Sequence, residues 1–150
     1  MDKLILCLAN SYKHGGRCIA GIEVSLQEGQ LSINKSSYGI PIWIGPVSHS
    51  AAGEVPLSDA TGIKVLSVVK IVNACYVGSG SHSEDYYYTK LQLLDTLNPS
   101  DEFLKKYTDT WHNYIFGNRG RALTPEAFQN GDYSLMLIRT EGSEIYLDTR

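Results

Sequence analysis

The chain has 150 residues, a length that suits one domain and leaves little room for two. Hydrophobic residues make up 43% of it and charged residues 19%, which excludes an intrinsically disordered chain. The formal net charge of −3 excludes a strongly basic protein that binds nucleic acid mainly through its overall charge. We therefore expect residues 1–150 to form a single domain whose function depends on local features.

The charge is divided unevenly along the chain. Residues 1–75 carry six Lys/Arg and five Asp/Glu, whereas residues 76–150 carry seven and eleven. A surface for nucleic acid, if the protein has one, is therefore expected on the first half of the chain. The favoured interpretation of these charges is an ordinary solvated surface.

Cysteine usage and hydropathy indicate the compartment. The three cysteines have no CxxC spacing, so we expect reduced thiols instead of a disulfide framework. The apolar run LILCLA is short and lacks a cleavage signature, which argues against a signal peptide. No stretch approaches the roughly 20 apolar residues of a membrane-spanning helix. These features predict a cytoplasmic protein with no membrane partner.

Most of the first two-thirds of the chain is predicted to form β-strands. The segments that favour strands are residues 3–9, 18–26, 31–37, 40–44, 63–75 and 86–94. Between the first two lies a basic loop whose Gly15 and Gly16 predict a sharp reversal. The segment 63–75 is longer than an average strand, which predicts a bulge or a strongly coiled strand.

One helix and a closing hairpin are predicted after these strands. The helix spans residues 99–116, because Pro99 suits its first position and Gly117 its end. Its aromatic face, expected to be buried, consists of Phe103, Tyr107, Trp111 and Tyr114. A short second helix at residues 124–126 and a hairpin of residues 133–140 and 143–148 follow. This order predicts a mainly β protein with α+β content, a small β-barrel with one amphipathic helix.

Catalytic motifs are missing from the sequence. It contains no GxSxG, GxxxxGK[ST] or HExxH motif, and no GxGxxG after a strand. His82, Glu84 and Asp85 group an imidazole with two carboxylates, a set that can ligate a metal or transfer protons. Because this triplet lies in a loop, a solvated turn is the favoured interpretation. We therefore expect no enzyme activity and no cofactor.

A zinc site across the first hairpin is also disfavoured. Cys7, His14 and Cys18 can approach one another there, but Cys7 lies in an apolar strand where burial is expected. We therefore expect that the protein requires no metal.

The strongest candidate for a ligand site is the loop of residues 12–17. Lys13 and Arg17 flank two glycines whose N–H groups can point together and bind an anion. Arg17 can hold a phosphate through two hydrogen bonds, and Tyr12 can stack on a base. The alternative interpretation is a tight hairpin with solvated charges.

Three other residues are weaker ligand candidates. Trp43 offers a second stacking surface, although its position between isoleucines favours the core. Arg119 and Arg121 lie in another basic, glycine-rich segment. The alternative for these two arginines is a favourable interaction with the carbonyl end of the preceding helix.

Five segments together resemble the dual OB-containing domain family of prokaryotes. They are LCLANSYKHGGRCIAGIEV, WIGPVS, HSEDYYY, IFGNRGRAL and YSLMLIRTE, and they occur in the expected order. The most specific part is the motif NS-x-K-x-GGRC-x-AG, which runs from Asn10 to Gly21. The resemblance implies an OB fold, recognition of nucleic acid or nucleotides, and a role near mobile-element or defence-type gene systems. It also places Lys13 and Arg17 beside the ligand face of the barrel.

The sequence departs from the family pattern in two ways. The family usually reads W-I-R-P where this chain has Gly45 in place of the arginine, which removes a phosphate contact. The family also tends to continue into a second OB unit, whereas this chain stops at Arg150 and resembles the first unit alone.

Two functions remain open on this basis. The favoured one is a non-catalytic module that binds single-stranded nucleic acid or a nucleotide, as an accessory component of a prokaryotic defence or mobile-element system. The alternative is a protein-interaction module that docks onto a protein partner without a nucleic-acid ligand, and the acidic net charge favours it.

Overall fold

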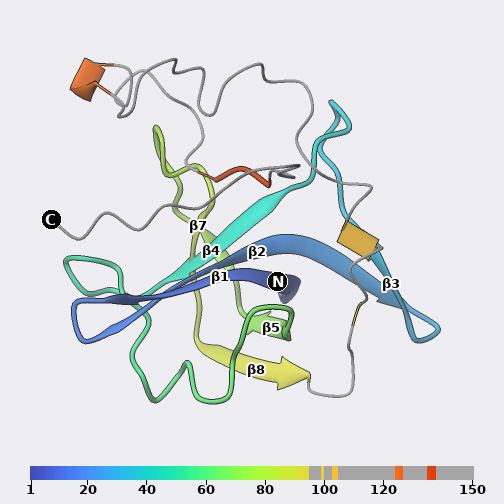
Figure 1. Ribbon diagram of the computed structural model, residues 1–150, viewed down its shortest axis with the longest axis horizontal. Coiled ribbons are helices and arrows are strands. Elements are labelled where there is room, and N and C mark those ends of the chain that lie inside the picture. The colour runs from blue at the N-terminus through green and yellow to red at the C-terminus, as the bar shows by residue number, and fades with distance from the viewer. Residues whose placement is uncertain (95–98, 100–102, 105–123, 127–134, 138–150) are drawn as a thin grey trace, which may run out of the picture.

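Figure 1 shows the computed structural model of the chain, which describes residues 1–94, 99, 103–104, 124–126 and 135–137. The eight strands in this part of the chain are β1 (Lys3–Lys13), β2 (Gly16–Gln27), β3 (Gln30–Ile33), β4 (Trp43–Val47), β5 (Val68–Val72), β6 (Cys75–Tyr76), β7 (Asp85–Tyr87) and β8 (Lys90–Leu94). No described helix is long and apolar enough to cross a membrane. The predicted mainly β class is confirmed.

The strands form one mixed sheet. Its order is β6-β7-β4-β2-β1-β5-β8, and β3 pairs with β2 beside this path. Neighbours are antiparallel apart from β4 and β7, which run parallel. Hydrogen-bonded pairing among the described strands leaves β6 and β8 as the ends of the ladder and does not close the predicted barrel. The long β1–β2 hairpin, which lies across the middle of Figure 1, is the central pair.

The expected loop between the first two strands is mostly strand. β1 continues to Lys13 and β2 begins at Gly16, so that only His14 and Gly15 form the turn. Both turn residues have positive φ, 47° and 81°, as a two-residue turn between twisted antiparallel strands requires. Pairing continues to the tip because it gives the backbone N–H and C=O groups of these polar residues cross-strand partners.

The prediction of one long strand over residues 63–75 is wrong. Only Val68–Val72 forms the regular strand β5, because Leu66 and Asn73, with φ of 72° and 52°, interrupt it on either side. The Leu66 N–H donates to the Cys7 carbonyl at 2.7 Å, which holds the first irregular residue against β1. After Asn73 the chain turns away from β1 and enters β6, which pairs with β7.

Residues 86–94 also form two strands where one was predicted. β7 pairs with β4 and β6, whereas β8 pairs with β5. Tyr88, between the two strands, donates a hydrogen bond from its hydroxyl to Asp59 at 2.8 Å. The break therefore lets the two halves of the segment join different parts of the sheet.

Apolar side chains pack on both faces of the central hairpin. Ile5 and Cys7 belong to one buried cluster, and Leu6, between them, belongs to another. This division follows from strand geometry, because adjacent side chains point to opposite faces. Phe103 and Leu104 pack against the second cluster.

Phe103, predicted to be buried, is half-buried, and the predicted helix of residues 99–116 lies outside the described residues apart from Pro99, Phe103 and Leu104. The other three residues of the predicted aromatic face, Tyr107, Trp111 and Tyr114, lie outside the described residues. So does the predicted hairpin, apart from residues 135–137.

An ion pair lies on the same side of the hairpin as the first cluster. Glu23 on β2 is only 8% exposed, and Lys3 on β1 donates a hydrogen bond to its carboxylate at 2.5 Å. The Lys3 Nζ also lies 5.5 Å from the centre of the Tyr86 ring. These contacts link β1, β2 and β7 below the hairpin tip.

Candidate functional site

The β1–β2 hairpin distributes the predicted ligand residues over two faces. Tyr12 is the cross-strand partner of Arg17, and Lys13 is the partner of Gly16. Cross-strand partners share a face of the sheet, whereas adjacent residues do not. Tyr12 and Arg17 therefore lie on one face and Lys13 on the other, so the two cations do not flank one common anion site.

Backbone groups at the tip of the hairpin contact the chain segment around Val55. The Arg17 N–H donates to the Val55 carbonyl at 2.8 Å, and is therefore engaged within the protein. A Cβ atom at Gly16 would lie 2.4 Å from that carbonyl oxygen, so this glycine is required by the close approach of two chain segments. Arg17 can therefore contact an anion only through its side chain.

A groove of about 440 Å³ opens on the face of Tyr12 and Arg17, and we call it the Arg17 groove. Its polar lining residues are Asn10, Arg17, Thr61 and Lys64. None of the described residues that line it is acidic. Tyr12, across the hairpin from Arg17, is 73% exposed. The groove thus combines two cations with an exposed aromatic ring beside it.

Asn10, which lines the Arg17 groove, has a side-chain oxygen that accepts no hydrogen bond from the described residues. Asn10 donates from Nδ2 to the Ile63 carbonyl at 2.9 Å. Its Oδ1 atom is buried and accepts no hydrogen bond from the described part of the chain. Asp59 precedes Ala60, which lines the groove, but does not itself line it. The Asp59 carboxylate accepts a hydrogen bond from the Tyr88 hydroxyl.

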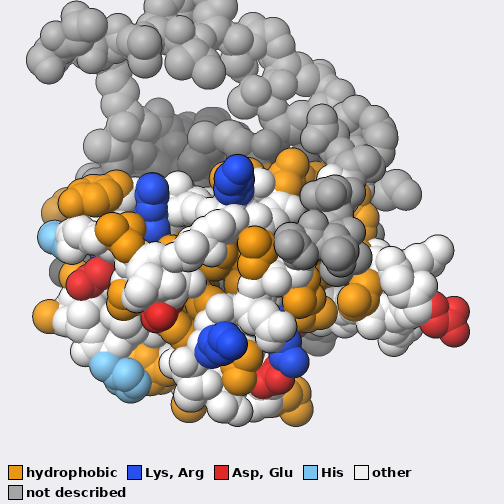
Figure 2. All heavy atoms as spheres, turned by 90° about the horizontal axis from the view of Figure 1, so that it is seen from below, with side chains coloured by type: hydrophobic (Ala, Val, Ile, Leu, Met, Phe, Trp, Pro, Cys, Tyr) orange, Lys and Arg blue, Asp and Glu red, His pale blue; other side chains and the backbone are white. Residues whose placement is uncertain are grey.

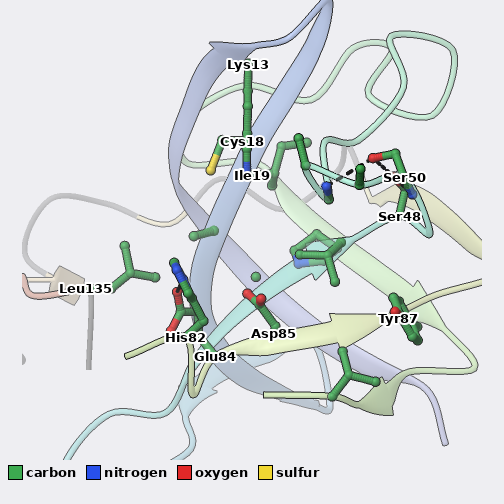
Figure 3. Close-up of a pocket in the computed structure, with 18 residues that line it drawn as sticks. Lys13, Cys18, Ile19, Ser48, Ser50, His82, Glu84, Asp85, Tyr87 and Leu135 are labelled. Carbon is green, nitrogen blue, oxygen red and sulfur yellow. Dashed lines mark hydrogen bonds and ion pairs between the residues drawn. The ribbon is translucent and has the colours of Figure 1, made fainter. Parts of the chain in front are cut away.

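A second cavity, of about 410 Å³, lies on the opposite face, and we call it the Lys13 cavity. Lys13 and Cys18 line it from the hairpin, and Gly45 lines it from β4. Figure 3 shows Lys13 reaching in from the hairpin, while His82, Glu84 and Asp85 lie together at the other end of the cavity. The loop of residues 48–53 forms a further wall.

His82, Glu84 and Asp85 form a compact group at this end. One potential ligand atom from each lies within 4.8 Å of the others, and His82 Nδ1 is 3.7 Å from Glu84 Oε1. Glu84 is 8% exposed, so the interpretation of this triplet as a solvated turn is wrong for Glu84. Burial, reinforced by the charge of Glu84, raises the pKa of Asp85, while His82 and Lys13 oppose this shift.

Gly45 leaves space beside the two carboxylates. Its N–H donates to the Glu84 carbonyl at 2.8 Å, which fixes the spacing of β4 and β7. A Cβ atom at Gly45 would lie 3.3 Å from Glu84 Cγ and 3.7 Å from Asp85 Oδ1. A side chain at this position would therefore meet carboxylates, which attract a cation and repel a phosphate.

The remaining candidates lie elsewhere. Trp43 is half-buried on β4, pairs with Ile22, and lines neither cavity. Arg119 and Arg121 lie outside the described residues. Cys7 is fully buried, and burial raises its pKa to about 11, so that its thiol is protonated at neutral pH.

Sequence reasoning missed Thr61 and Lys64, which complete the Arg17 groove from a segment predicted as loop and strand. Their positions follow from long-range contacts, because the Asn10 side chain holds the Ile63 carbonyl beside β1. No local pattern indicates this contact.

No curated protein and no solved structure matches the chain. The family model of the dual OB-containing domain matches residues 3–150, a range that includes all eight strands and both cavities. The OB fold is thus implied by the family, whereas the described strands by themselves show a mixed sheet. The resemblance seen in the five sequence segments is confirmed, and the chain belongs to the dual OB-containing domain family.

Proposed function

We propose that this protein is a non-catalytic module that binds single-stranded nucleic acid or a nucleotide along the Tyr12–Arg17 face of the β1–β2 hairpin. The observation that supports this most is the Arg17 groove, where two cations and an exposed tyrosine adjoin with no acidic residue among the described lining. Membership of an OB-containing family suggests a binding module, since OB folds often bind oligonucleotides.

Each side chain has a distinct part in this proposal. Arg17 offers a planar fork of donors that matches two phosphate oxygens, whereas Lys64 acts as a point charge. Tyr12 provides a face for base stacking, a contact worth about 1–3 kcal/mol per base. A groove of about 440 Å³ falls in the size range of small-ligand sites, so it suits one nucleotide of a strand or a free nucleotide.

The charge distribution favours local contacts over long-range attraction. The formal net charge is −3. Figure 2 shows Lys and Arg side chains on one face of the molecule separated by hydrophobic and acidic ones, not gathered into a continuous patch. We therefore expect a shallow salt dependence, with each phosphate contact contributing about 0.7 to the slope of log K against log salt for single strands.

The direct test is fluorescence anisotropy with labelled oligothymidylate, measured at low salt and then at rising salt. Tyr12→Ala should weaken binding by about fivefold to a hundredfold, the range expected for one lost stacking contact. Tyr38→Ala is the matched control, because Tyr38 is 88% exposed and lies in the connection between β3 and β4. Competition with unlabelled nucleotides then separates a strand-binding site from a mononucleotide site.

The protein-interaction alternative predicts a different result. Absence of binding to single-stranded DNA, RNA and nucleotides at low salt would overturn the nucleic-acid proposal and favour a protein partner. Binding that is equally strong in folded Tyr12→Ala and parent protein would contradict the proposed face.

We also infer from the family resemblance that the module serves a defence or mobile-element system as an accessory component. Affinity purification from the native host, with identification of both nucleic acid and proteins, tests this context. Nuclease treatment of the bound material distinguishes partners held through nucleic acid from partners held by direct contact.

A further inference from the structure

The acidic end of the Lys13 cavity has the donor set of a metal site. One imidazole nitrogen and two carboxylates place potential ligand atoms within 4.8 Å of one another. Ligand bonds to Zn²⁺ are about 2.0–2.2 Å long for nitrogen and oxygen, so the donors of a tetrahedral site lie about 3.3–3.6 Å apart. His82 Nδ1 and Glu84 Oε1, 3.7 Å apart, already approach this spacing, and side-chain rotation must bring the three donors together from within 4.8 Å.

We propose that His82, Glu84 and Asp85 bind one divalent transition-metal ion at the end of the Lys13 cavity. This differs from the sequence-based expectation that the protein requires no metal, and it is independent of the Arg17 groove.

The backbone supports the three donors from both sides. Asp85 is held by the parallel pairing of β7 with β4, where its partner is Gly45. The Glu84 carbonyl accepts a hydrogen bond from the Gly45 N–H at 2.8 Å. His82 exchanges two backbone hydrogen bonds with Ser79, at 3.0 and 3.2 Å, which close the loop that carries it. The donors are therefore arranged before any ion binds, which lowers the ordering cost of binding.

The electrostatic setting favours a cation. Glu84 and Asp85 are adjacent, and Glu84 is almost completely buried. Placing two carboxylates together away from water is unfavourable unless positive charge compensates them. Lys13, which lines the same cavity, provides part of this compensation. A divalent ion between the carboxylates would supply the rest.

The donor types narrow the choice of ion. Ca²⁺ and Mg²⁺ prefer oxygen ligands, whereas an imidazole suits Zn²⁺, Fe²⁺ and similar ions, and carboxylates suit Mn²⁺ as well. Three protein ligands leave at least one coordination position open. The cavity, about 410 Å³ in volume and without a side chain at Gly45, has room there for water or a ligand oxygen.

Isothermal titration calorimetry of the metal-free full chain with Zn²⁺, and separately with Mn²⁺, tests this proposal. We expect one ion per chain, and at least a tenfold loss of affinity in His82→Ala and in Asp85→Asn, since even changes outside the ligand shell cost about 10–100-fold. The matched control is His14→Asn, which removes an exposed imidazole from the hairpin turn, where asparagine tolerates the positive φ of 47°. This variant should bind like the parent.

A further variant tests the cavity without removing a ligand. Gly45→Arg places a guanidinium near the two carboxylates, and its Cβ atom is accommodated if Glu84 Cγ, 3.3 Å away, shifts by a few tenths of an ångström. It should fold, as judged by an unchanged circular dichroism spectrum, and should no longer bind the ion. The proposal would be overturned if the parent protein binds no ion, or if His14→Asn loses binding. It would also be overturned if His82→Ala, Asp85→Asn or folded Gly45→Arg binds the ion as tightly as the parent.

Discussion

The two faces of the β1–β2 hairpin carry opposite electrostatic surroundings although alternating residues of the same strands build them. On one face Arg17 is joined by Lys64 and by no acidic residue among the described lining of its groove. On the other face Lys13 shares a cavity with Glu84 and Asp85. A basic sequence motif thus does not by itself make a basic site. The elements packed against each face decide whether an anion or a cation is favoured there.

The largest expected effect comes from breaking the ion pair between Lys3 and Glu23, which joins the two strands that build both faces. Lys3→Met leaves the Glu23 side chain, 10% exposed, without its partner at 2.5 Å. We expect a loss of about 3 kcal/mol in the free energy of unfolding, the low end for breaking a buried ion pair, because the Lys3 side chain is 24% exposed. Urea denaturation measures this.

The double variant Lys3→Met/Glu23→Gln distinguishes a charge effect from a packing effect. If the uncompensated carboxylate is the cause, the double variant should regain most of the lost stability. If it remains as unstable as Lys3→Met, the loss comes from packing against Tyr86 and not from the charge.

The next effect distinguishes the two glycines at the hairpin tip. Gly16→Ala forces a Cβ atom to 2.4 Å from the Val55 carbonyl oxygen, so backbone must move, and we expect a loss of about 2–3 kcal/mol. Gly15→Ala meets no atom within 4 Å and only carries a methyl group at φ 81°, which costs about 1–2 kcal/mol. In thermal denaturation, Gly16→Ala should therefore have a lower melting temperature than Gly15→Ala. Equal losses would show that the contact with Val55 relaxes freely.

Part of the fold could be predicted from the sequence, and the failures have a common physical cause. The central strands follow from apolar residues of high β propensity, and the family follows from the motif that begins at Asn10. The interruption of the segment 63–75 could not be predicted, because Leu66 has no turn preference. Its φ of 72° accompanies a tertiary hydrogen bond to Cys7.

The sequence identified residues of the candidate sites but not how the fold arranges them in space. Tyr12, Lys13 and Arg17 were identified, but their division between two faces depends on the turn being two residues long. A shift of one residue in register would reverse the faces. The triplet at His82 was visible as well, whereas the burial of Glu84 depends on the parallel pairing of β7 with β4. Strand pairing over such separations leaves no local pattern.

Measuring both oligonucleotide binding and Zn²⁺ binding in a variant of each face tests whether the two faces act separately. Arg17→Ala should weaken binding to labelled oligothymidylate by about tenfold, and lower the salt slope by about 0.7 if one phosphate contact is lost. It should leave the affinity for Zn²⁺ unchanged, because Arg17 lines only the first of the two cavities. Lys13→Ala should leave oligonucleotide binding close to that of the parent. Equal loss of oligonucleotide binding in both variants would mean that the ligand wraps around the hairpin tip.

The smallest expected effect is that of Lys13 on the opposite face. Lys13 reaches into the cavity that contains Glu84 and Asp85, and its charge opposes the rise in the pKa of Asp85. Removing it in Lys13→Ala should strengthen Zn²⁺ binding by about two- to threefold, since charges that interact across a solvent-filled space contribute less than about 1 kcal/mol. The gain should disappear at high salt, because exposed charges are screened there. A weaker Zn²⁺ affinity in Lys13→Ala would instead mean that this lysine orders the cavity. A gain in Zn²⁺ affinity that persists at high salt would mean that Lys13 contacts a carboxylate directly.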